Sequence, residues 1–194
     1  SLLLDTQIAT FLVTGSVTWL YYADRLMEFP LGVFSIALAT VILPGLAAHH
    51  AAQSPERFNA TLDWAVKLTV IVVLPATVAL VMLAGPLTVT IFHYGKFNAH
   101  DVRMASLALM AYASGLFAFS MVKVLAPGYF ARQDTRTPVR IGIQALGLNM
   151  GLNLAIVLPL ALVNDRPGLH ALLALNNGIG AWYNSTMLYR GLRR

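Results

Sequence analysis

The chain has 194 residues, 58% of them hydrophobic and only 11% charged, with a mean hydropathy of +0.69 and a formal net charge of +5. Because soluble domains carry about 25% charged residues, this composition excludes an ordinary soluble domain and predicts an all-α polytopic membrane protein. The positive charge does not indicate nucleic-acid binding, since the arginines cluster at the ends of apolar runs and no basic stretch is interleaved with aromatic residues.

The apolar runs predict about five complete transmembrane helices and one partial helix, because about 20 apolar residues span a 30 Å hydrocarbon core. The chain starts inside an apolar run without Met or a signal peptide, so we expect a fragment of a longer protein. We expect a polar loop over residues 49–59, a short helix over 87–94 and Asn98 as the cap of the helix that follows it. All spans belong to one transmembrane domain over residues 1–194: a partial span over 1–13 and complete spans over about 17–48, 65–84, 99–125, 139–163 and 169–189.

Basic residues predict the orientation of these spans. The loops after residues 48, 125 and 189 lie on one side, and Lys and Arg residues are more frequent in and near them than on the other side. The first side is therefore expected to be cytoplasmic. The residues counted there are Arg57, Lys67, Arg132, Arg136, Arg140, Arg190, Arg193 and Arg194, against Lys96, Arg103 and Arg166 on the other side.

The span over residues 17–48 carries Asp24, Arg25 and Glu28 near its middle. Charges inside a span cost several kcal/mol when they face lipid, so they normally face protein or water. Pro30 follows directly and is expected to kink the helix, because it has no N–H to donate. Polar and small residues spaced by threes and fours predict one wall of a water-filled cavity: Thr14, Thr18, Tyr21, Arg25, Glu28, Gly32, Ser35 and Ala39.

Arg25 is a candidate anion-binding residue, because a guanidinium donates paired hydrogen bonds to phosphate oxygens. The alternative is a structural ion pair with Glu28, three residues further along the helix. Asp24 and Glu28 are candidates for the same substrate site, or for binding a proton or a cation. Lys123 either extends to the cytoplasmic head groups or adds a second positive charge to the cavity.

Asp5, Asn149 and Asn153 offer oxygen atoms within apolar segments and form a candidate Na⁺ site, although buried asparagines more often link helices by hydrogen bonds. Gly147 and Gly151 form a G-x-x-x-G pattern, which favours close helix packing. The chain has no cysteine and no recognised nucleotide-binding, hydrolase or zinc-protease motif, so we expect neither an enzyme nor any cofactor apart from that ion.

Three stretches resemble the MurJ/MviN lipid II flippases of the MOP superfamily: SVTWLYYADRLMEFPLGVFSIALATVILP (16–44), GPLTVTIFHYGKF (85–97) and VKVLAPGYFARQDTRTPV (122–139). The resemblance covers essentially the whole chain. It implies a C-terminal lobe, running from the end of the seventh span through the twelfth, that lacks the N-terminal lobe with which it would form a transporter.

The resemblance also implies a function in the bacterial inner membrane. Such proteins move lipid II, the undecaprenyl-diphosphate-linked peptidoglycan precursor, between leaflets by alternating access. Arg25, Asp24 and Glu28 match the family's ADRLMEFP motif, whose arginine is thought to hold the head group. Asp5, Asn149 and Asn153 lie where some members bind Na⁺. The alternatives are another exporter of the superfamily, for a polyprenyl-linked oligosaccharide or a drug, and a non-transporting scaffold for cell-wall synthesis.

Overall fold

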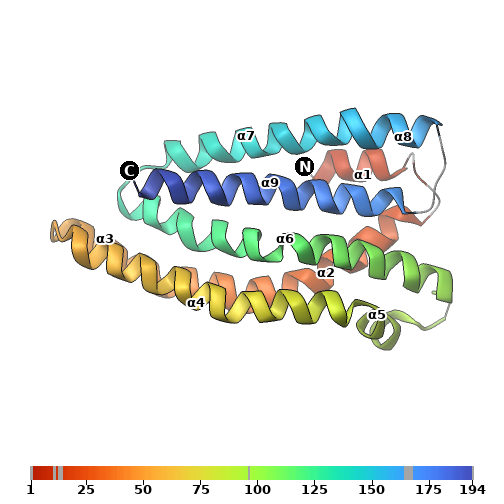
Figure 1. Cartoon of the computed structure of the whole chain (residues 1–194), viewed down its shortest axis with the longest axis horizontal. Coiled ribbons are helices and arrows are strands. Elements are labelled where there is room, and N and C mark those ends of the chain that lie inside the picture. Colours follow the sequence, from red (N-terminus) through yellow and green to blue (C-terminus); the bar gives the residue numbers. More distant parts are fainter. Residues whose placement is uncertain (1, 11, 13–14, 96, 164–167, 194) are drawn as a thin grey trace.

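The computed structural model describes residues 2–10, 12, 15–95, 97–163 and 168–193, and every regular element in these residues is helical (Figure 1). The expected all-α membrane fold is therefore confirmed. The elements in chain order are α1 (Leu2–Thr10), α2 (Ser16–Pro30), the π-helix η1 (Leu31–Ile36), α3 (Ala37–Ala51), α4 (Pro55–Met82), α5 (Ala84–Phe92), α6 (Ala99–Ala131), α7 (Arg136–Leu152), the π-helix η2 (Asn153–Val157), α8 (Leu158–Val163) and α9 (Leu169–Leu192).

Four helical segments in the described residues are long and apolar enough to cross a membrane: Ser16–Ala51, Pro55–Met82, Ala99–Ala131 and Arg136–Ala161. α9, over which a fifth span is expected, has 24 residues but a more polar composition. Its buried His170 and Asn176 bond to neighbouring helices, so protein rather than lipid surrounds these polar groups.

Two of the expected loops are shorter in the structure. α3 continues to Ala51 and α4 already begins at Pro55, so most of the stretch expected as a loop over 49–59 is helical. Pro55 suits the first position of α4, because the first residues of a helix have no intrahelical partner for their N–H groups. α6 likewise continues through Pro127 to Ala131, beyond the expected end at 125. Asn98 caps α6 as expected, accepting hydrogen bonds from the N–H groups of His100 and Asp101.

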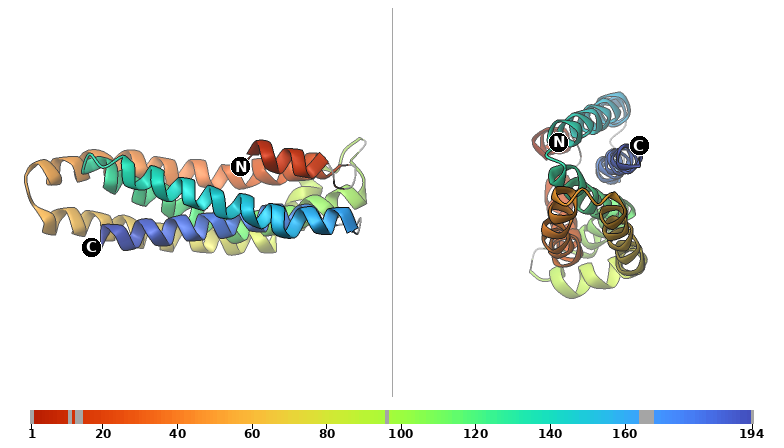
Figure 2. Two further views of the ribbon diagram at one scale, coloured as in Figure 1. Left: turned by 90° about the horizontal axis from the view of Figure 1, so that it is seen from above. Right: turned by 90° about the vertical axis from the view of Figure 1, so that its left-hand side faces the viewer.

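α6 is the central helix and packs most extensively against α9, then against α4 and α2. Most helices run along one long axis, whereas α5 lies across one end (Figure 2). α6 and α9 approach closely where Gly115 faces Gly178: a Cβ atom placed on Gly115 would lie 2.7 Å from the Cα atom of Gly178. Among the described residues no atom lies within 4 Å of the Cβ positions of Gly147 and Gly151, so the close helix packing expected at these glycines is not found there.

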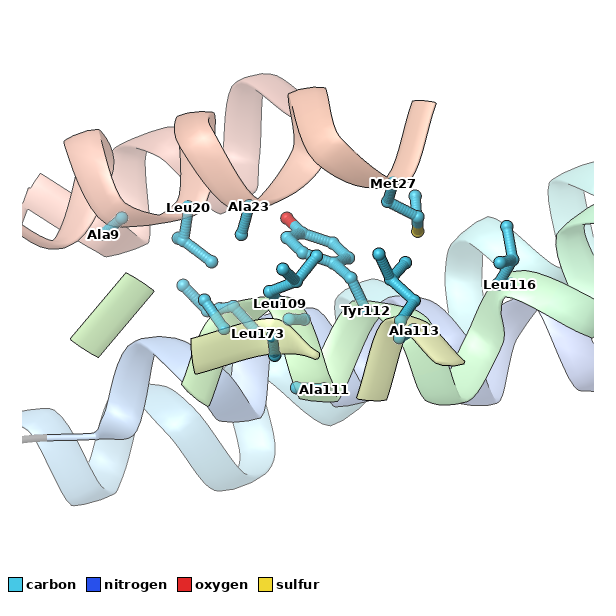
Figure 3. Close-up of a cluster of buried hydrophobic side chains, with 14 of the residues drawn as sticks. Ala9, Leu20, Ala23, Met27, Leu109, Ala111, Tyr112, Ala113, Leu116 and Leu173 are labelled. Atoms are coloured by element: carbon cyan, nitrogen blue, oxygen red, sulfur yellow. The ribbon is translucent and has the colours of Figure 1, made fainter. Parts of the chain in front are cut away.

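A cluster of buried apolar side chains joins α2 to α6. Leu20, Ala23 and Met27 of α2 face Leu109 and Tyr112 of α6, and the ring of Tyr112 extends from α6 toward Ala23 and Met27 (Figure 3). This contact fixes the rotation of α2 about its own axis, and so it decides which polar residues of α2 face inward.

The backbone directly after Pro30, where a kink is expected, forms the π-helix η1. The backbone changes from α-helical to π-helical at Leu31 and returns to α-helical at Ala37. A π-turn contains more residues than an α-turn, so it rotates every later residue relative to the earlier ones. The second π-segment, η2, contains Asn153 and precedes Pro159.

Candidate functional site

A hollow of about 500 Å³ lies between α1, α2, α6 and α9, and we call it the central hollow. Its walls carry both signs of charge, with two carboxylates from α2 and an amine from α6. Its polar and charged lining consists of Thr6, Tyr21, Asp24, Glu28, Tyr112, Lys123 and Asn177. Tyr112 is not among the residues predicted to line a cavity, although a tyrosine within the apolar run of α6 was a visible signal.

The face of α2 that lines the central hollow differs slightly from the polar stripe predicted from the sequence. The lining includes Asp24 and Glu28, and it includes Tyr21 but not Arg25. Ala23 and Met27 are buried against α6 and so fix which face of α2 points inward. Asp24 and Glu28 directly follow these two residues in the sequence, so they lie beside the buried face. The carboxylates of Asp24 and Glu28 thus line the hollow, whereas Arg25 does not, although it bonds to Glu28.

Arg25 forms the ion pair that its spacing allows. Its Nη1 donates to Oε2 of Glu28 over 2.8 Å, and its guanidinium lies 5.1 Å from the centre of the Tyr21 ring. The side chains of Arg25 and Glu28 are 58% and 51% exposed on this chain. A guanidinium has five N–H donors, so most of them stay available after one bond to Glu28.

Thr18 and Ser35, both expected in the cavity stripe, lie away from the central hollow. Thr18 lines a separate hollow at the end of the molecule where α5 lies. Ser35 is buried in an apolar crevice between η1 and α4, and its Oγ has no hydrogen-bond partner among the described residues. The rotation introduced by η1 explains why Ser35 leaves the face occupied by Glu28.

Lys123 lines the central hollow and also a second hollow of about 280 Å³ between α6, α7 and α9. No ion pair within 4 Å involves Lys123 among the side chains that the structure describes. Its positive charge is therefore available to a ligand in either space.

Asn149, Asn153, Asn176 and Asn177 form a ladder of hydrogen bonds between the α7–η2 segment and α9. Asn176 Nδ2 donates to Asn153 Oδ1 (2.7 Å), Asn153 Nδ2 to Asn149 Oδ1 (3.4 Å), and Asn149 Nδ2 to Asn177 Oδ1 (3.1 Å). The interhelical role expected as the alternative to Na⁺ binding is therefore present. The side chain of Asp5, the third residue of the candidate Na⁺ site, lies outside the described part of the structure.

Comparison with known proteins identifies the family. The family model for lipid II flippase MurJ matches residues 1–194. The probable lipid II flippase MurJ of Haemophilus influenzae is 47% identical over 200 residues, which include 100% of this chain and 38% of that protein. The lipid II flippase MurJ of Burkholderia cenocepacia is 42% identical over 194 residues, with 100% and 36% covered. The chain thus spans little more than a third of the length of these relatives.

The fold agrees with that assignment. A solved structure of lipid II flippase MurJ in an inward closed conformation superimposes with a TM-score of 0.85, at 24% identity, over 98% of this chain and 38% of that one. At this identity the likeness establishes the fold alone, and the family rests on the full-length match of the family model. The chain belongs to the lipid II flippase MurJ family.

Proposed function

We propose that this chain is the C-terminal lobe of a lipid II flippase in the bacterial inner membrane. In this role it lines one side of the path along which the undecaprenyl-diphosphate-linked precursor crosses the bilayer, by transport without a catalytic step. Family membership supports the proposal, and so does the share of its longer relatives that the chain covers. The missing N-terminal lobe would supply the opposite side.

The observation that carries the proposal is the exposed ion pair of Arg25 and Glu28, about a third of the way along the membrane-length segment Ser16–Ala51. Such a pair is costly against lipid, so its exposed side requires water or another part of the protein. A water-filled path between two lobes meets this requirement. Together with Lys123 in the central hollow, Arg25 gives the path positive charge suited to a diphosphate.

The pairing of Arg25 with Glu28 suggests how cargo is held and released. In the absence of cargo, Glu28 neutralises Arg25. When a diphosphate arrives, its oxygens accept the hydrogen bonds that Glu28 accepted before, and the freed carboxylate repels the anion. This exchange keeps binding weak enough for release on the other side of the membrane.

A sodium ion at Asp5, Asn149 and Asn153 stays a prediction. Binding there requires carbonyl oxygens to turn toward the cation, whereas Asn149 Oδ1 and Asn153 Oδ1 each accept a hydrogen bond from another asparagine. An ion at this place would therefore have to rearrange the asparagine ladder.

Arg25→Ala in the full-length parent protein tests the proposed function. We expect the variant to fail to support growth of cells depleted of their own flippase. Loss of charge-assisted hydrogen bonds worth about 1.5–3 kcal/mol should weaken binding of a diphosphate lipid by about ten-fold or more. The measurements are growth of depleted cells, protein level in membranes and binding of purified lipid II.

Arg190→Ala serves as the control, because Arg190 is exposed near the end of α9 and away from the central hollow. It should support growth like the unaltered protein. Normal growth with Arg25→Ala would contradict the role of Arg25. A scaffold without transport predicts instead that Arg25→Gln is silent, and accumulation of another lipid-linked oligosaccharide in depleted cells would indicate a different exporter.

A further inference from the structure

The hollow lined by Thr18 differs in its chemistry from the other two and lies next to α5. Figure 1 shows α5 at the end of the bundle opposite the C-terminus. This hollow measures about 430 Å³, which lies within the range of small-molecule sites. We call it the aromatic hollow, because five of its lining residues are aromatic and one is a carboxylate: Trp19, Tyr22, Phe92, Tyr94, Phe97 and Asp101.

Tyr22, Phe92 and Phe97 pack against one another in tilted and edge-to-face pairs rather than as a parallel stack. Tyr22 lies 4.4 Å from Phe92 at an interplanar angle of 40° and 5.5 Å from Phe97 at 87°, measured between ring centres. Because the planes differ so much, the electron-rich faces of these rings point in different directions. An arrangement of this kind can surround a ligand, whereas an ordinary belt of aromatic residues at the membrane interface encloses no such space.

Asp101 contributes the negative charge and is held firmly in place. Its Oδ1 accepts a hydrogen bond from Nε1 of Trp19 (2.9 Å), and its Oδ2 accepts one from the backbone N–H of Asn98 (3.0 Å). Each carboxylate oxygen can accept more than one hydrogen bond, so both retain capacity for a ligand. Asp101 is the only side chain with a full charge among the described residues that line this hollow.

We propose that the aromatic hollow binds an ammonium group, with the aromatic faces attracting the cation and Asp101 neutralising it. Electron-rich ring faces within about 6 Å of a cation stabilise it, and the effect grows where water is excluded. The ammonium group can belong to a zwitterionic phospholipid or to the molecule being carried.

The proposal is independent of the transport role proposed above, and choline tests it directly. Full-length protein in a polyoxyethylene detergent, which carries neither an ammonium group nor a sugar, is titrated with choline and with its neutral analogue 3,3-dimethylbutan-1-ol. Binding is followed by saturation-transfer NMR. We expect choline to bind and the neutral analogue, which has the same shape, to bind at least about five-fold more weakly.

Two variants assign the binding to this hollow. Phe92→Leu keeps apolar volume but removes a ring face, and Asp101→Asn removes the charge while keeping an acceptor for Trp19. Each should weaken choline binding by about three- to ten-fold. Phe130→Leu is the matched control, because Phe130 is an exposed aromatic residue at the opposite end of α6. It should leave choline binding unchanged.

Equal binding of the neutral analogue, or unchanged choline binding in a folded Phe92→Leu protein, would overturn the proposal. Binding of a methyl glycoside in place of choline would also overturn it, in favour of a sugar site. Nanodiscs then separate the two sources of the ammonium group. Choline binding should be weaker in nanodiscs of phosphatidylethanolamine than in those of phosphatidylglycerol if the ligand is a phospholipid. Displacement of choline by purified lipid II, equal in both lipids, would instead assign the site to an amine of the cargo.

Discussion

Gly115→Val is expected to prevent stable folding of the full-length protein. A Cβ atom at position 115 would lie 2.7 Å from the Cα atom of Gly178 and 3.0 Å from a ring carbon of Phe119. The first of these contacts is with backbone, so no side-chain movement relieves it and α6 must separate from α9. We expect a loss of about 3 kcal/mol, at the upper end of overpacking costs. Thermal denaturation in detergent and the yield of monodisperse protein measure the effect.

Two further glycine substitutions serve as controls for Gly115→Val. A Cβ atom on Gly178 would lie 3.4 Å from the nearest Gly115 atom, so Gly178→Ala should cost much less. Gly147 is exposed on α7 with no atom within 4 Å of its Cβ position, so Gly147→Val should melt like the unaltered protein. A Gly115→Val protein with unchanged yield and melting temperature would refute the close contact between α6 and α9.

Asn153→Leu is expected to produce the second large loss of stability. Asn153 is 1% exposed and stands between Asn149 and Asn176 in the asparagine ladder. Its removal takes an acceptor from Asn176 and a donor from Asn149, and a buried polar group without a partner costs about 1–3 kcal/mol. We expect a net destabilisation of about 2 kcal/mol, measured by reversible unfolding in mixed micelles.

The double variant Asn153→Leu/Asn176→Leu distinguishes a hydrogen-bond effect from a simple packing defect. Removing both partners eliminates the unsatisfied group on Asn176, so the double variant should be more stable than the sum of the two single variants predicts. Strict additivity would show that the two side chains do not interact. An effect of Asn153→Leu close to zero would show that the ladder contributes nothing to the stability of the fold.

The membrane fold could be predicted from the sequence because each span has to satisfy its own backbone within one continuous apolar run. The ion pair of Arg25 with Glu28 and the cap at Asn98 were also predictable, because both are contacts between residues close together in the sequence. The expectation for Ser35 depended on an unbroken helical period, which η1 interrupts.

Features that depend on partners far away in the chain were not predictable. Asp24 faces the central hollow more directly than Arg25 because α2 is rotated by its apolar contacts with α6, 80 or more residues further along. The glycine pattern on α7 had the expected spacing, but no described helix packs against these two glycines, whereas Gly115 and Gly178 meet without belonging to a shared sequence motif. Spacing within one helix cannot reveal which other helix will lie beside it.

The central position of α6 has a consequence for how the protein is made. Of the most apolar 18-residue stretch of α6, 61% of residues are buried, against 17% in each of Ser16–Ala51 and Pro55–Met82. The most apolar stretches of these two earlier segments can therefore be solvated by lipid as soon as they enter the bilayer. α6 presents Gly115 to a helix that has not yet been translated, so its packing is completed only after α9 enters the bilayer, and a nascent chain stopped before α9 would leave that surface to lipid or to a chaperone.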